Sequence, residues 1–121
     1  MATPDIIDVA TIKGVLIAGA VNNSAHDIVD VAADHTYKIN TLAISNIHGT
    51  NDATISVSVS ADNGSNYYHL AKTVTVPADS TVYVITKDTS IYLDETDLLR
   101  VVASAANMLE YVCSYETLDD A

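Results

Sequence analysis

Short runs of alternating apolar and polar residues, separated by turn residues, constrain the fold of this chain most. The clearest run is Thr54–Ser60, in which Ile55, Val57 and Val59 alternate with Ser and Thr. Such period-two alternation is typical of a β-strand with one face in the core and the other in water. Asp62-Asn63-Gly64 follows, and these residues tolerate positive φ, so they predict a hairpin turn.

The same succession of strand-like runs and turns extends along the whole chain. The predicted strands are Thr11–Val21, Ala25–Val31, Thr36–Asn46, Thr54–Ser60, Tyr67–Val76, Thr81–Thr86, Ile91–Leu93, Leu98–Ser104 and Leu109–Thr117. Eight or nine short strands joined by hairpin-length turns predict an all-β fold, an antiparallel β-sandwich of jelly-roll type. Gly14–Ala20 and Asp27–Asp34 also fit short helices, although the glycines that flank the first segment argue against one.

The length of 121 residues predicts a single domain over 1–121, with flexible ends at about 1–8 and 118–121. Because Phe and Trp are absent, Val, Ile, Leu and Ala must fill the core. The longest apolar stretch, Gly14–Val21, is too short to cross a bilayer as a helix. The N-terminal segment carries acids where a signal peptide needs Lys or Arg, so secretion by the Sec route is not expected.

The charge balance excludes two classes of partner. Five Lys or Arg residues against sixteen Asp or Glu give a net charge of −11. Nucleic acids and anionic membrane surfaces need clustered cations, which this chain lacks. The acidic excess keeps the protein soluble or steers it toward a basic partner. The single cysteine, Cys113, allows no internal disulfide, and we expect a buried, inert thiol and a reducing site of synthesis.

Residues suited to catalysis or metal binding are present but poorly arranged. Ser24, His26 and Asp27 have the types of a hydrolase triad, yet they crowd into four positions, where neighbouring strand residues point to opposite faces. The four histidines lack the spacing of metal ligands; they are His26, His35, His48 and His69. We therefore predict no catalytic, cofactor or metal site.

Two acidic turns resemble calcium loops only in composition. Asp62–Asn66 offers several oxygens but lacks the length and the closing Glu of an EF-hand. The turn with Asp94, Glu95 and Asp97 is similar. Asx-rich hairpin turns have the same composition without metal, so the sequence favours ordinary turns at both places.

Four residues are candidates for an interface. Val102 and Val112 are apolar on strand faces that are otherwise polar. Tyr67 and Tyr68 are adjacent, so we expect one in the core and the other at the surface, where Tyr is a common contact residue. Together with nearby asparagines, the two tyrosines also support a rival interpretation, a carbohydrate-binding or host-recognition module.

Several segments resemble a family of small virion structural proteins of tailed bacteriophages, notably phages of marine and cyanobacterial hosts. The resemblance spans about residues 4 to 117 and rests on Lys38–Leu42, Tyr68–Lys72, Val76–Thr81, Ile91–Leu93 and Cys113–Glu116. It implies a non-enzymatic β-sandwich present in many copies on the particle. The family usually carries Gly in the acidic turn before its penultimate strand, where this chain has Thr96.

These observations together predict a virion protein that binds other virion proteins through sheet edges and terminal arms. The favoured role is a capsid decoration or cement protein on the major capsid protein, made in the host bacterial cytoplasm. A neck, collar, tail or fibre-attachment component is the alternative. We also expect a homo-oligomer, a trimer or a ring, because closed symmetry is common in such building blocks.

Overall fold

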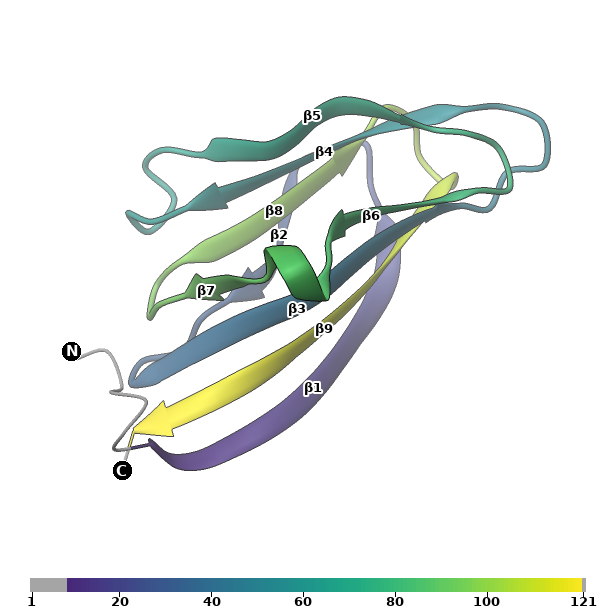
Figure 1. Cartoon of the computed structure of the whole chain (residues 1–121). Helices are drawn as coiled ribbons and strands as arrows, with labels where there is room; N and C mark the ends of the chain where they lie inside the picture. Colours follow the sequence, from purple (N-terminus) through teal and green to yellow (C-terminus); the bar gives the residue numbers. More distant parts are fainter. Residues whose placement is uncertain (1–8, 121) are drawn as a thin grey trace.

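The computed structural model describes residues 9–120, which form nine β-strands and one 3-10 helix (Figure 1). The strands are β1 (Val9–Val21), β2 (His26–Asp30), β3 (His35–Asn46), β4 (Ala53–Ser60), β5 (Tyr68–Val76), β6 (Thr81–Ile85), β7 (Ile91–Leu93), β8 (Leu98–Ala103) and β9 (Leu109–Asp120). The 3-10 helix η2 (Lys87–Thr89) lies between β6 and β7. No helix in this part of the chain is long and apolar enough to cross a membrane.

Two antiparallel sheets pack face to face. Sheet A has the order β1-β9-β3-β6, and β7 pairs with β3 on the same side as β6. Sheet B has the order β2-β8-β4-β5. Figure 1 shows the two layers, with β1, β9 and β3 in one and β4, β5 and β8 in the other.

The strand order is that of a jelly roll. The chain pairs as one long hairpin, β1 with β9, β2 with β8, β3 with β6 and β7, and β4 with β5. Rolling this hairpin brings β9 beside β3 and β8 beside β4, which closes the two sheets. If β6 and β7 are taken as one strand interrupted by η2, the result is the eight-stranded arrangement of this architecture.

The predicted antiparallel β-sandwich is confirmed, and each predicted strand is present. The helical interpretations of Gly14–Ala20 and Asp27–Asp34 are wrong, because the first lies within β1 and β2 occupies most of the second. β9 extends to Asp120, which pairs with Val9 of β1. Of the ends that we expected to be flexible, residues 1–8 and 121 lie outside the described residues.

Aliphatic side chains fill the space between the sheets, as expected for a chain without Phe or Trp. Sheet A contributes Ile39, Leu42, Ile44, Leu109 and Cys113, all fully buried. Sheet B contributes Ile55, Val57, Leu99 and Val101, which are also fully buried. Most of these residues alternate with outward-facing ones, and this period-two pattern made the strands predictable. In β3 a register shift between Ile39 and Thr41 interrupts the alternation, so Ile39 and Leu42 are both buried.

Asn46 at the end of β3 is buried and fully bonded. Its Nδ2 donates to the carbonyl oxygens of Asn51, at 3.0 Å, and Val76, at 2.9 Å. Its Oδ1 accepts from the backbone N–H of His48 at 2.8 Å. One side chain thus links the end of β3, the following loop and the end of β5.

Several turns contain residues in the left-handed region. Asn63 and Gly64 have φ of 58° and 91°, which fits the predicted hairpin turn between β4 and β5. Thr96 has φ of 68°, so it occupies a backbone conformation that glycine adopts with less strain. The acidic turn therefore holds Thr96 in a conformation that few non-glycine residues adopt.

Candidate interaction surface

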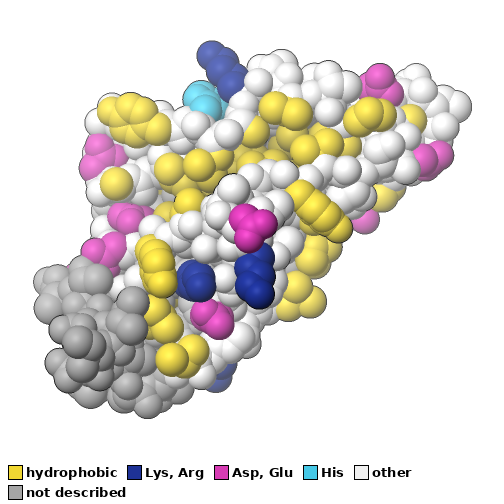
Figure 2. Space-filling view, in the orientation of Figure 1, with side chains coloured by type: hydrophobic (Ala, Val, Ile, Leu, Met, Phe, Trp, Pro, Cys, Tyr) yellow, Lys and Arg dark blue, Asp and Glu magenta, His cyan; other side chains and the backbone are white. Residues whose placement is uncertain are grey.

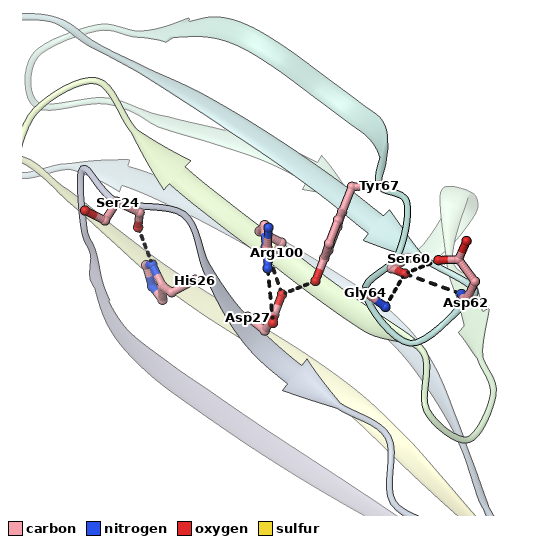
Figure 3. A network of polar contacts seen from close by, with 8 residues as sticks. All are labelled: Ser24, His26, Asp27, Ser60, Asp62, Gly64, Tyr67 and Arg100. Carbon is pink, nitrogen blue, oxygen red and sulfur yellow. Dashed lines mark hydrogen bonds and ion pairs between the residues drawn. The ribbon is translucent and has the colours of Figure 1, made fainter.

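The residues with the composition of a hydrolase triad do not form one. His26 Nδ1 lies 3.1 Å from the backbone carbonyl oxygen of Ser24, not from its hydroxyl. Asp27 turns away from His26 toward Arg100 of β8, as Figure 3 shows. Because nucleophile, base and carboxylate do not converge, these three side chains lack triad geometry.

Asp27 instead belongs to a polar cluster on the outer face of sheet B. Arg100 Nε donates to Asp27 Oδ1 at 3.0 Å, and Tyr67 Oη donates to the same oxygen at 3.0 Å. The Arg100 guanidinium lies 3.8 Å from the centre of the Tyr67 ring, a cation–π contact. Figure 3 shows Tyr67 reaching from the segment before β5 across β8 toward β2.

The polar groups of this cluster are one another's hydrogen-bond partners. The hydrogen bond to Asp27 is the main cause that raises the pKa of Arg100. Desolvation, followed by the hydrogen bond to Asp27, raises the pKa of Tyr67. The cluster ties the edge strand β2 to β8 and to the β4–β5 connection, so its evident role is structural.

The two tyrosines do not divide between core and surface as predicted. Tyr67 is half-buried against Arg100, and Tyr68 is 72% exposed, so neither lies in the core. The prediction of a core tyrosine was wrong because it overlooked a partner for the ring on the outer face of the sheet. With Arg100 over its ring, Tyr67 offers less free aromatic surface for stacking on a sugar.

The first acidic turn is closed by its own side chains. Asp62 accepts hydrogen bonds from the backbone N–H of Asn66, at 2.9 Å, from Asn66 Nδ2, at 2.8 Å, and from Ser60 Oγ, at 2.8 Å. These bonds, with that to the Asn66 side chain the largest cause, lower the pKa of Asp62. Hydrogen bonds from within the turn and from the end of β4 thus engage the Asp62 carboxylate.

The second acidic turn is bonded in a similar way. Asp97 Oδ2 accepts the backbone N–H of Asp94 at 2.8 Å, and Glu95 Oε2 accepts that of Asp34 at 3.0 Å. Burial raises the pKa of Asp97. Within the described residues, no group of three or more His, Cys, Asp or Glu side chains has the arrangement of a metal site.

Val112 lies in an apolar row that crosses the whole outer face of sheet A. The strand register places Ala18 of β1 beside Val112 of β9, Val112 beside Ala43 of β3, and Ala43 beside Tyr83 of β6. Val112 is 42% exposed and Tyr83 60% exposed. Leu16, also on β1 and 67% exposed, extends the apolar surface along the edge. Figure 2 shows apolar side chains over this sheet from β6 to β1.

A shallow hollow lies beside this row, between β1 and β9. It has a volume of about 290 Å³. Small residues line it on the β1 side and larger ones on the β9 side: Ala18, Gly19, Ala20, Glu110, Tyr111 and Val112. An apolar side chain from a partner fits such a hollow better than a flat surface.

Val102, the other predicted valine, has different surroundings. It lies on the outer face of sheet B, half-buried, opposite Ser56 of β4. The adjacent pairs on this face are polar, Arg100 with Ser58 and Arg100 with Asp27. Val102 is therefore a single apolar residue among polar neighbours, whereas Val112 belongs to a continuous row.

The edges of the two sheets also differ. β2 has only five residues, and its register shifts between Asp27 and Val29. The register of β5 shifts twice against β4, and Thr73 has φ of 54°. The third edge is interrupted by η2 between β6 and β7. β1, by contrast, has 13 residues and an unbroken register with β9 from Thr11 to Val21.

Comparison with known proteins identifies a shared fold. No protein-family model matches the sequence, and no curated protein matches it. A chain of the Bacillus endospore appendages, described as a novel family of disulfide-linked pili, is similar with a TM-score of 0.51. The identity is 16%, and the match covers 92% of this chain and 88% of that one. At this identity the likeness concerns the fold alone.

Two further solved structures are more distant. A pentameric capsid protein from metagenomic phage sequences has a TM-score of 0.43 and 16% identity, over 87% of this chain and 62% of that one. A chain of infectious bursal disease virus, Gt strain, has a TM-score of 0.43 and 8% identity, over 92% of this chain and 32% of that one.

Proposed function

We propose that this chain is a non-enzymatic structural protein of a bacteriophage virion that binds neighbouring virion proteins through the outer face of sheet A. The observation that carries the proposal is the exposed apolar row Ala18–Val112–Ala43–Tyr83. Water-exposed apolar rows are a liability in a free monomer, and contiguous ones mark surfaces that another protein covers. Tyr83 at one end fits this role, because Tyr is enriched in protein interfaces.

The role on the particle that we favour is capsid decoration or cement, in contact with the major capsid protein. The resemblance to small virion proteins supports this role, and the fold shared with a pilus chain is compatible with a repeated building block. Many identical contacts around a particle give stable attachment even when each contact is weak. Attachment at the neck, collar or tail would use the same surface.

Mass spectrometry of purified particles tests the proposal directly. We expect this chain among the abundant virion proteins, and its absence from mature particles would refute the structural role. Cryo-electron microscopy of the same particles then separates capsid from neck and tail positions.

A rebinding experiment tests the surface. Particles stripped of this chain are incubated with the wild-type protein or with Val112→Asp. A carboxylate placed in an apolar contact loses hydration without a partner, so occupancy should fall at least about tenfold. Val102→Asp is the matched control, because Val102 is also an apolar residue on an outer face, half-buried opposite Ser56, but lies on β8 of the other sheet. Equal loss with both variants would contradict docking through sheet A.

A further inference from the structure

The free edge of β1 has the properties of a pairing surface. Within the described residues β1 pairs with β9 on one side only, so backbone N–H and C=O groups face outward along the other side. Natural edge strands are blunted by short length, bulges, proline or charges. From Gly14 to Val21 this strand has none of these devices. The one charged residue of β1 is Lys13, just before this segment.

The occupant that fits this edge is a second copy of the same chain. The chain carries a net charge of −11, so two copies repel each other over most of their surfaces. β1 contains no Asp or Glu. It offers a long edge where two copies meet without bringing carboxylates into the seam.

The sequence of β1 is also self-complementary in size. In an antiparallel pair, residues directly opposite each other lie on the same face. If the pair is centred on Ile17, Leu16 of one copy lies opposite Ala18 of the other, and Val15 lies opposite Gly19. Leu16 and Val15 then each meet a small residue, while Ile17 meets its own counterpart. The two Lys13 side chains lie at opposite ends of the seam, each opposite Val21 of the other copy.

The hollow beside β1 supports the same register. Ala18, Gly19 and Ala20 form its β1 side. In the register centred on Ile17, Leu16 of the second copy lies beside Ala18 and covers this hollow. Leu16, which is 67% exposed in the single chain, would thereby become buried.

We propose that two copies of this chain pair antiparallel along the free edges of β1, centred on Ile17, and join their A sheets into one continuous sheet. A two-fold axis through the seam is perpendicular to the sheet, so both outer faces point to the same side. The two apolar rows then form one longer surface. This pairing goes beyond the proposed function and does not depend on it.

Light scattering of the purified full chain over a concentration series tests the pairing. We expect a dimer for the wild type. Leu16→Glu should raise the dissociation constant at least about tenfold, since each copy brings one charge into the seam. Leu70→Glu is the matched control, because Leu70 is also exposed, 41%, but lies on the edge strand β5 of sheet B. A monomeric wild type, or dissociation by Leu70→Glu rather than Leu16→Glu, would overturn the proposal.

Disulfide trapping tests the register. Chains with Leu16→Cys and chains with Ala18→Cys are mixed under oxidising conditions. We expect a cross-link between the two kinds of chain that exceeds the cross-link in either kind alone. The native Cys113 is fully buried and does not compete. Preferential cross-linking of Leu16→Cys with itself would refute the register centred on Ile17. If light scattering finds a monomer while mass spectrometry finds the chain abundant in particles, the pairing is refuted and the proposed function stands.

Discussion

The thiol of Cys113 should react only when the sandwich opens, and its reaction rate can therefore report on native-state stability. Cys113 lies on the inner face of β9, between Ile17 of β1 and Leu42 of β3, and is fully buried. This burial raises its pKa from 9.0 to about 12. The thiolate is the reactive form, so at pH 8 the reactive fraction falls about a thousandfold relative to an exposed thiol.

The assay follows the reaction of native protein with a chromogenic disulfide reagent at pH 8. We expect a slow reaction that becomes fast in denaturant, and a rate that falls when the protein is stabilised. The control places the thiol one residue further on, Ser114→Cys in a Cys113→Ser background, because Ser114 lies on the outer face of the same strand. If native Cys113 reacts as fast as this control, the burial argued from the strand alternation is wrong.

The same raised pKa predicts a loss of stability at alkaline pH. Above about pH 9 the thiol ionises in the unfolded chain, while in the folded chain it keeps its proton up to a pKa of about 12. The unfolded state then binds fewer protons, so the free energy of unfolding falls by up to about 1.4 kcal/mol per pH unit in this range. Denaturation of wild type and Cys113→Ala at several pH values measures the difference, which should narrow above pH 9. A constant difference would contradict the shift.

Three further changes test the packing by chemical denaturation. Thr36→Val should raise the free energy of unfolding by about 1 kcal/mol, because the buried Thr36 hydroxyl has no hydrogen-bond partner in the described structure. A loss of stability would contradict this. Asn46→Ala should lower the free energy of unfolding by about 2–3 kcal/mol, because the buried carbonyl of Val76 loses its donor. An unchanged denaturation midpoint would contradict a stabilising role of the Asn46 hydrogen bonds. Gly19→Ala should cost about 1 kcal/mol, because its Cβ would lie 3.1 Å from the Tyr111 ring. Gly14→Ala should leave the free energy of unfolding nearly unchanged, because no atom lies within 4 Å of the added Cβ.

The strands could be predicted from the sequence because their signals are local. Alternation such as Ile55-Ser56-Val57 decides which face of a strand is buried, and Asn63-Gly64 marks the turn that follows. Neither signal determines which strand pairs with which. The pairing of β1 with β9 joins the two ends of the chain, and only the rolled topology of the folded structure reveals it.

The polar cluster on sheet B could not be predicted for the same reason. Arg100 and Asp27 are 73 positions apart, and Tyr67 and Asp27 are 40 apart. One signal was available: Arg100 is the single charged residue of β8, and a half-buried guanidinium needs an acidic partner. That signal indicates that a partner exists, and several acids in the chain satisfy it equally well.

Val112 shows how far a local signal extends toward function. Its position among Glu110, Ser114 and Glu116 breaks the polar side of β9, which is visible in the sequence alone. The neighbours that make it part of a surface, Ala18 and Ala43, come from strands far away in the chain. Val102 gave the same local signal, yet its neighbours are polar, so local pattern alone did not separate the two valines.

The position of each apolar residue within sheet A also decides which contact a substitution affects. Tyr83 lies on β6, at the opposite end of sheet A from β1, so a charge there disturbs docking on the outer face and leaves the β1 seam intact. Leu16 lies on the edge strand, so a charge there disturbs the seam as well as the end of the apolar surface. A dimer that persists in Tyr83→Asp but is lost in Leu16→Glu would therefore separate pairing through the edge from docking through the face.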